Sequence, residues 1–260
     1  MGNFKTLAVK PTIQSLHPFS AGDLLFDWTA FDIPNGAAEL TGVSGTILGT
    51  NGASQGGELF NLFFARAIDG AVPPSLGTLN DAVAATTSIL SKKHIIGFRA
   101  IDFGESADAV LDSMASYNCF GTNYSTTTTP HQQGTVLEGE TFAPQTNPGY
   151  QRIYVAGVAE SSIDFGTSVF VAGGAHSEDD LTIVVDNGSG GASNSTKVFQ
   201  VGDVIHCADN DGGNPVSTTM TVSAVTTTLV TVSGTTCPAL AENQELGPVN
   251  PIELKFDLKY

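Results

Sequence analysis

Two aspartates one residue apart, Asp209 and Asp211, are the candidate metal ligands of this sequence. They lie in the segment DNDGG at residues 209–213, where paired carboxylates followed by glycine can wrap a hard cation such as calcium. The EF-hand pattern fails, however, because its twelfth position counted from Asp209 is Met220 instead of glutamate. The other interpretation is a polar hairpin loop without a metal, and this is the one we favour.

The remaining reactive residues form no recognisable catalytic set. The five histidines are scattered, so the sequence does not indicate a zinc site. His176 precedes the acidic run at residues 178–180, which is either a loop cation site or a solvated turn. A nucleophile elbow, a phosphate-binding loop and a dinucleotide fingerprint are all missing from the sequence. Carboxylate pairs such as Asp102 with Glu105 could serve a glycosidase, but 26 acids produce such pairs by chance. We therefore expect no enzymatic activity and no cofactor.

The sequence has three cysteines, Cys119, Cys207 and Cys237. A set this small, with an odd number of members, does not indicate a disulfide framework. Cys207 and Cys237 could pair, because both lie in the C-terminal part of the chain. The alternative is three reduced thiols in a protein made in a cytoplasm.

The charge distribution excludes several classes of partner. The 260 residues carry a formal charge of −16, and the stretch from Ile153 to Leu254 holds twelve acids and a single basic residue, Lys197. Such a surface repels nucleic acid phosphates and anionic lipids. No apolar run approaches the roughly 18 residues of a membrane span. We therefore expect neither nucleic acid nor membrane among the partners.

The 29 glycines and 12 prolines indicate many short strands joined by turns. In the first strand Phe26 and Trp28 are expected to face one way, and Leu25, Asp27 and Phe31 the other. The strand at residues 59–66 is apolar on both faces and is therefore expected to be central. The expected strands of this part of the chain are 24–33, 39–48, 59–66, 94–102 and 151–158.

Three segments of the first 178 residues are expected to be something other than strand. A short helix is expected from Asn80. A second helix is expected over residues 105–115, where Val110, Leu111 and Met114 form an apolar stripe. Residues 121–148 are rich in threonine, glutamine and glycine and are expected to form a long exposed loop.

The last part of the chain indicates a small barrel inserted into a larger unit. A strand at residues 181–186 and a hairpin formed by 218–224 and 228–233 belong to the barrel. Residues 252–258 alternate strictly between apolar and charged, which is typical of a half-buried strand, and their natural partner is the N-terminal segment 4–13. The expected domains are a body formed by 1–178 with 249–260, and an inserted barrel formed by 179–248.

Several segments spread over most of the chain carry a family resemblance. They are FDWTAFDIPNGAA at 26–38, the strand at 60–66, PPSLG at 73–77, NPGY at 147–150, the strand at 153–158 and FQVGDVI at 199–205. In these segments the chain resembles structural proteins of virions from tailed phages of marine bacteria. The resemblance implies an all-β fold with a jelly-roll or β-sandwich body and an inserted small β-barrel. It carries over no functional residues.

The resemblance also implies a function and partners. It points to a head decoration (cement) protein on the capsid surface of the virion, made in the host cytoplasm. The expected partners are the major capsid protein and further copies of the chain, as a homotrimer. Lys92, Lys93 and Arg99 are the candidate residues for docking to an acidic shell. The alternatives are a carbohydrate-binding or adhesion module, a tail or fibre component, and a hydrolase whose site the sequence does not reveal.

Overall fold

The structure is a computed structural model in which nearly all elements are strands. It describes residues 2–13, 18–52, 59–84, 91–102, 107–111, 114–120, 135–140, 149–208, 219–234 and 237–260. Among the described residues, the 3-10 turn η1 (Thr50–Gly52) and the short helix α3 (Ser195–Val198) accompany the strands. Within the described residues no helix combines the length and the apolar character needed to cross a bilayer.

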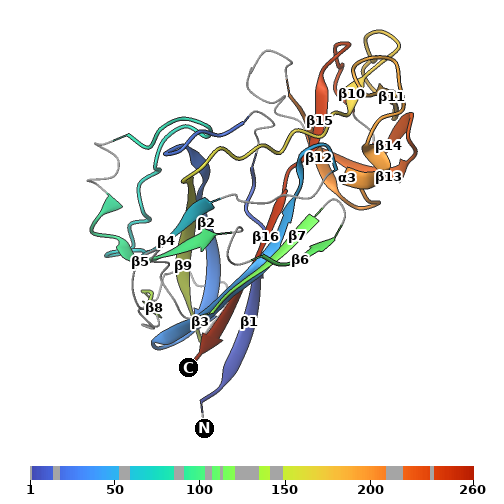
Figure 1. The fold of residues 1–260 in the computed structure, drawn as a ribbon. Coiled ribbons are helices and arrows are strands. Elements are labelled where there is room, and N and C mark those ends of the chain that lie inside the picture. Colours follow the sequence, from blue (N-terminus) through green and yellow to red (C-terminus); the bar gives the residue numbers. More distant parts are fainter. Residues whose placement is uncertain are drawn as a thin grey trace.

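Eight strands form the body of the molecule as two facing sheets (Figure 1). One sheet has the order β1-β16-β3-β7, and the other has the order β2-β9-β4-β5. The first sheet continues from β7 to β6 (Ala107–Leu111), and β8 (Thr135–Leu137) pairs with β3. The eight body strands are β1 (Phe4–Val9), β2 (Leu24–Pro34), β3 (Ala38–Leu48), β4 (Leu59–Arg66), β5 (Ile95–Asp102), β7 (Met114–Phe120), β9 (Tyr150–Ala159) and β16 (Ile252–Lys259).

The pairing of these strands is that of a jelly roll. The four strands of the first half pair in reverse order with four of the second half, as β1–β16, β2–β9, β3–β7 and β4–β5, and every pair is antiparallel. The arrangement is one long hairpin rolled up, which places alternate pairs in the two sheets. The predicted all-β fold with a jelly-roll body is therefore confirmed.

An apolar core fills the space between the two sheets. Phe31 and Phe64 come from one sheet and Phe256 from the other, and their ring centroids lie 5.1 Å (Phe31–Phe256) and 5.4 Å (Phe64–Phe256) apart. The inward side chains of β16 are all buried, as the strict alternation in residues 252–258 predicts. The predicted pairing of this strand with the N-terminal segment is also confirmed, with Leu7 opposite Phe256.

The outer face of the second sheet is partly covered by the chain that follows β4. Trp28 packs there against Leu24 and Leu76, and its indole Nε1 donates a hydrogen bond to the carbonyl of Pro74 at 2.8 Å. The expected alternation in β2 is wrong, because the register shifts between Leu24 and Thr29. Leu24, Leu25 and Phe26 are consequently all buried, on the two sides of the sheet.

The helix expected over residues 105–115 is wrong. Residues 107–111 and 114–120 form the antiparallel pair β6–β7, with Val110 opposite Ala115. The open edge of β3 accepts β7 over seven residue pairs, and this backbone pairing overrides the local apolar spacing that favoured a helix over 105–115. Asn80 itself lies in a turn with a φ of 56°, and its N–H donates to the carbonyl of Leu24, so no helix begins at this residue. Ser91 is helical, and residues 85–90 before it lie outside the described part of the structure.

The expected loop at residues 121–148 contains ordered structure. Leu137 of β8 is fully buried and pairs with Ala38 of β3. Residues 121–134 and 141–148 of this loop lie outside the described part of the structure.

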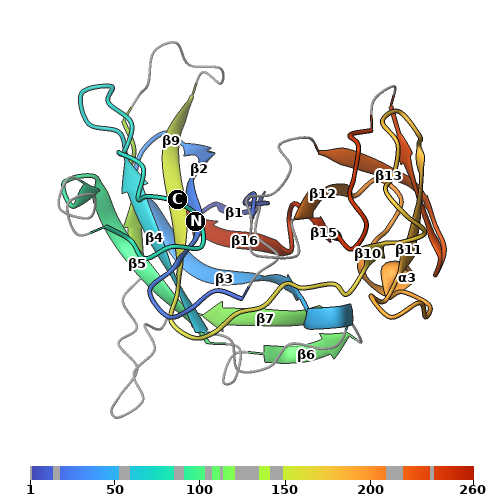
Figure 2. The ribbon, with the colours of Figure 1, turned by 90° about the horizontal axis from the view of Figure 1, so that it is seen from above.

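A closed six-stranded barrel is inserted between β9 and β16, in the order β10-β11-β14-β13-β12-β15. Its strands are β10 (Phe170–Val171), β11 (Thr182–Asp186), β12 (Val204–Ala208), β13 (Met220–Val225), β14 (Leu229–Ser233) and β15 (Glu245–Pro248). The expected range 179–248 omits β10, which closes the barrel by pairing with both β11 and β15. Figures 1 and 2 show the barrel beyond one end of β3 and β16, with the two termini of the chain at the other end.

Replacing Phe256 with alanine tests how far the body depends on its aromatic core. The change empties a fully buried site that contacts both sheets, and we expect it to lower the free energy of unfolding by about 3–5 kcal/mol in denaturant titrations. Phe98→Ala is the control, because Phe98 is 47% exposed and contacts Phe63 only on the outside of the sheet. It is expected to cost about 1 kcal/mol. Equal effects of the two changes would contradict this account of the core.

Candidate functional site

The cavity of interest lies in the angle between the body and the barrel and has a volume of about 450 Å³. This is within the usual range for small-molecule sites. The sheet contributes polar side chains from its outer face, and the barrel contributes the turn that leads into β12. Its polar lining includes Lys10, Thr46, Glu253, Lys197, Gln200 and Asp203. With two lysines and two acids among these side chains, the cavity is polar and has no excess of either charge.

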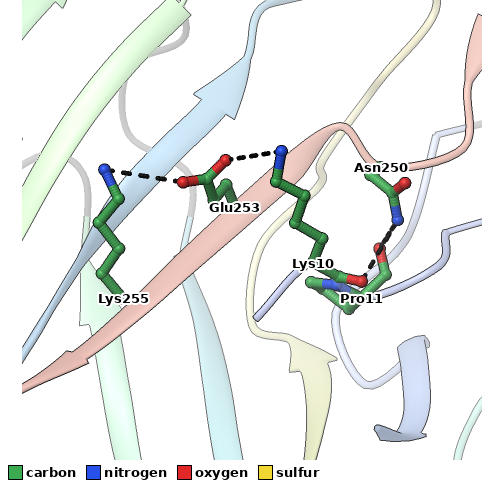
Figure 3. A network of polar contacts seen from close by, with 5 residues as sticks. All are labelled: Lys10, Pro11, Asn250, Glu253 and Lys255. Atoms are coloured by element: carbon green, nitrogen blue, oxygen red, sulfur yellow. Dashed lines mark hydrogen bonds and ion pairs between the residues drawn. The ribbon is translucent and has the colours of Figure 1, made fainter. Parts of the chain in front are cut away.

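Figure 3 shows the polar network on the body side of this cavity. The carboxylate of Glu253 lies between two ammonium groups, at 3.1 Å from Nζ of Lys10 and 3.6 Å from Nζ of Lys255. The side-chain amide of Asn250 donates hydrogen bonds to the carbonyls of Pro11 (2.8 Å) and Lys10 (3.3 Å). The network therefore ties the chain that leaves the barrel to the segment that follows β1.

Backbone and side-chain contacts of η1 fix the chain where it enters the barrel. The hydroxyl of Thr50 donates to the carbonyl of Asp164, and the N–H of Asn51 donates to the carbonyl of Gly166, both at 2.7 Å. Ser168 also hydrogen-bonds to the side chain of Asn51. At the end of β3, Leu48 packs into the core of the barrel. The body and the barrel are thus joined by more than the two connecting segments.

The carboxylate of Glu245 organises the same entry segment from the barrel side. Its Oε1 accepts hydrogen bonds from the backbone N–H groups of Thr167 (2.6 Å) and Ser168 (2.8 Å). Burial raises the pKa of Glu245, the hydrogen bonds from Ser168 and Thr167 oppose this, and the charge of Asp164 adds to it. Because the folded pKa lies above the ordinary value, protonation of Glu245 favours the folded state as the pH falls. The arrangement is a structural clasp, since the carboxylate of Glu245 is held by the backbone N–H groups of Thr167 and Ser168 and by the hydroxyl of Thr167.

His206 in β12 is the most unusual buried polar residue of the barrel. Its neighbours Ile205 and Cys207 belong to the barrel core, so its ring lies on the outer side of the barrel wall, yet it is only 1% exposed. Neither ring nitrogen has a hydrogen-bond partner in the described structure. Burial lowers the pKa of His206 to about 4. The imidazole is therefore neutral at physiological pH.

The second buried histidine, His176, is satisfied by its surroundings. Its Nε2 lies 2.6 Å from the carbonyl of Asp180 and 3.4 Å from Sγ of Cys237, which also contacts the sulfur of Met220. Burial, with a contribution from nearby aspartates, raises the pKa of the Cys237 thiol, which removes the thiolate that a nucleophile requires. The ring of His176 thus makes a hydrogen-bonded contact in the barrel, and the acidic residues 178–180 that follow it are exposed.

Cys207 and Cys237 are both buried free thiols, so the pairing considered from the sequence is not formed. The side chain of Cys119 lies outside the described part of the structure.

The three candidate docking residues are not equivalent. Lys92 and Lys93 are exposed in the turn before β5. Arg99 is only 3% exposed, and its guanidinium Nη2 donates to the carbonyl of Leu40 at 3.2 Å. The expectation that Arg99 docks to a shell is therefore wrong, because its guanidinium group is buried between the two sheets.

Asp209 and Asp211, the metal candidates, lie outside the described residues. Among the residues that are described, no group of three or more histidine, cysteine and acidic side chains could hold a metal ion.

Sequence reasoning missed the cavity, Glu245 and His206. The polar residues of the cavity come from segments up to about 240 positions apart in the chain, such as Lys10 and Glu253. The one available signal was the Val-Gly-Asp-Val turn at residues 201–204, which brings Asp203 to the cavity. Burial of Glu245 and His206 arises from tertiary packing, and no local pattern marks it.

Comparisons with known proteins add little to these observations. No family model matches the chain, and no curated protein matches it. Similar solved structures include chains of infectious bursal disease virus, Gx strain (9% identity, TM-score 0.17) and Gt strain (8%, 0.18), with 99% of this chain aligned in both. This chain spans only 40% and 42% of those two chains. A chain of Sulfolobus Turreted Icosahedral Virus has 10% identity and a TM-score of 0.16, with 99% of this chain and 90% of that chain covered. At TM-scores this low the superpositions carry no argument, and the fold assignment depends on the strand pairing alone.

The buried neutral His206 predicts a loss of stability in mild acid. The unfolded chain binds a proton at this side chain below about pH 6.5, whereas the folded chain does so only near pH 4, so stability falls as the pH drops through this window. The full effect is roughly 3 kcal/mol. We expect His206→Leu to reduce the difference in unfolding free energy between neutral pH and about pH 4, measured by denaturant titration. An unchanged pH dependence in this variant would show that His206 is not the group responsible.

Proposed function

We propose that this chain is a non-enzymatic structural subunit of a virus particle, most specifically a decoration (cement) protein on the outside of a capsid. The observation that carries the proposal is the eight-stranded jelly roll with a second unit inserted before its last strand. Jelly rolls recur in viral capsid proteins and in lectins. Because one fold hosts many functions, the fold alone decides neither role.

The chemistry of the described residues supports a role in binding over a role in catalysis. His176, His206, Cys207 and Cys237 are buried in the barrel, His94 is buried in the body, and the carboxylate of Glu245 accepts hydrogen bonds from backbone N–H groups. The strongly acidic sequence of the barrel, with Lys197 as its single cation, keeps copies of the protein apart in solution. A barrel directed outward and a body docked to the major capsid protein are consistent with this charge distribution.

The alternative is a carbohydrate-binding or adhesion module, on a tail or fibre or elsewhere. The cavity between body and barrel favours it, because hydroxyl, amide and charged side chains line a volume suitable for a sugar. Trp28 does not contribute a stacking platform, since its ring packs under the segment containing Leu76. Glycan titrations followed by calorimetry separate the two functions, because a decoration protein is not expected to bind free glycans.

Detection on purified particles tests the virion role directly. Mass spectrometry of particles of the virus that encodes the chain should find it in many copies relative to the major capsid protein. Immunogold labelling with antibodies against the purified chain should decorate heads. Labelling confined to tails would support the tail or fibre alternative. Absence from particles in which the major capsid protein is detected would refute the proposal.

Charge reversal at Lys92 and Lys93 tests the docking part of the proposal. If these exposed lysines contact an acidic shell, Lys92→Glu with Lys93→Glu should weaken binding to particles stripped of the protein by about tenfold or more. Sedimentation of the bound fraction with the particles provides the measurement. Lys197→Glu is the control, because Lys197 lies on the barrel and should not touch the shell. Equal binding by the double variant and the unaltered protein would locate the docking surface elsewhere.

A further inference from the structure

The outer face of the first sheet carries a row of alternating charges. In β16 the apolar side chains point into the core, and those on the outer face are Glu253, Lys255, Asp257 and Lys259. The row therefore reads negative, positive, negative, positive along the strand. Its side chains remain accessible, with exposed fractions of 30% for Glu253, 45% for Lys255 and 50% for Lys259. Figure 3 shows Glu253 and Lys255 of this row.

The strands on either side of β16 carry mostly small side chains beside this row, and the exception is Glu39 of β3, which lies opposite Lys259 and ion-pairs with it at 3.8 Å. On β3 the residues opposite Asp257, Lys255 and Glu253 are small, namely Gly42, Ser44 and Thr46. On β1 the residues opposite Asp257 and Lys255 are Thr6 and Ala8, both exposed. Over Lys255 and Asp257 these small neighbours leave room for a second sheet at the usual separation of about 10 Å between packed sheets, while the barrel borders the row at Glu253, where both line the cavity.

A row of four alternating charges is complementary to its own reversed copy. We propose that this face binds a second copy of the chain across a two-fold axis that lies between the two sheets, perpendicular to β16. The axis reverses the strand direction, so Glu253 faces Lys259 of the partner subunit and Lys255 faces Asp257 of the partner subunit. All four positions of the row then face an opposite charge. A two-fold axis parallel to the strands would place like charges opposite each other, which disfavours it.

The same axis gives a partner to an exposed aromatic ring. Phe4 of β1 is 71% exposed and lies opposite Lys259 of β16. At the other end of this strand pair, Lys10 is ion-paired to Glu253. Reversal of the strand direction brings Phe4 over Lys10 of the partner subunit, where the ammonium can contact the face of the ring. The face formed by β1 and β16 is thus complementary to its own copy through an aromatic ring as well as through ion pairs.

The proposed contact differs from the homotrimer expected from the sequence, and it does not depend on the proposed virion role. A two-fold contact of this kind is closed and gives a dimer. Individual exposed ion pairs contribute little and are screened by salt, so the dimer should dissociate as the ionic strength rises. A contact formed mainly by apolar side chains would not respond in this way.

The mass in solution and a charge swap test the proposal together. Light scattering after size-exclusion chromatography, over a range of protein concentrations at low salt, should give twice the 26.9 kDa mass of the chain. Lys255→Glu places two carboxylates opposite each other at two symmetry-related points, and the dimer should weaken by about tenfold or more. Combining Lys255→Asp with Asp257→Lys gives the order negative, negative, positive, positive, which is again complementary to its reversed copy. The swapped variant should therefore recover the dimer.

The control is Lys92→Glu with Lys93→Glu, which changes exposed charges outside this face and should leave the dimer intact. Thermal unfolding of each variant separates a lost contact from a lost fold. A monomer at every concentration, a trimer, a dimer unaffected by Lys255→Glu, or a swapped variant that stays monomeric would each overturn the proposal. None of these outcomes bears on whether the chain is found in virus particles.

Discussion

The pairing of β1 with β16 is the constraint on which the rest of the structure depends. It joins the first strand to the last across nearly the whole sequence, with Leu7 opposite Phe256. Because β16 also pairs with β3, the same strand completes the first sheet and supplies Phe256 to the core between the sheets. The barrel can lie outside the body because the chain leaves the body after β9 and returns to it in β16.

The joint between the two units has few polar contacts, but they are specific. Glu245 holds the N–H groups of the entering segment, and Asn250 holds the exit segment against the chain that follows β1. Leu48 belongs to a body strand but packs in the core of the barrel, so a rotation of one unit against the other would expose apolar surface. The cavity beside the joint is therefore bounded by two surfaces of fixed relative position, as a site with constant geometry requires.

Much of the fold was predictable because its signals are local. The strict alternation in residues 252–258 and the two apolar faces of residues 59–66 correctly indicated an amphipathic strand and a central strand. The hairpin β6–β7 was not predictable, since apolar spacing at Val110, Leu111 and Met114 fits a helix equally well, and the open edge of β3 decides the outcome. Shifts of register in β2 invert the faces of its side chains without any local sign such as glycine.

Site residues were harder to predict than strands, because their environment is set by distant parts of the chain. Arg99 has the sequence signature of a surface cation, but it is buried against the carbonyl of Leu40. Net charge, in contrast, can be counted directly from the sequence, and the barrel has few basic residues whatever its fold.

The position of β16 also has a consequence for how the chain folds during synthesis. All six strands of the barrel precede residues 252–259 in the chain, so the body lacks one strand until these residues have been made. Until β16 arrives, β1 has no partner and the edge of β3 beside it remains open, with Phe31 and Phe64 deprived of Phe256. Contacts this distant in sequence form slowly. Until then the body has an unpaired strand edge, which is the kind of surface that favours aggregation, and the unit attached to it is acidic.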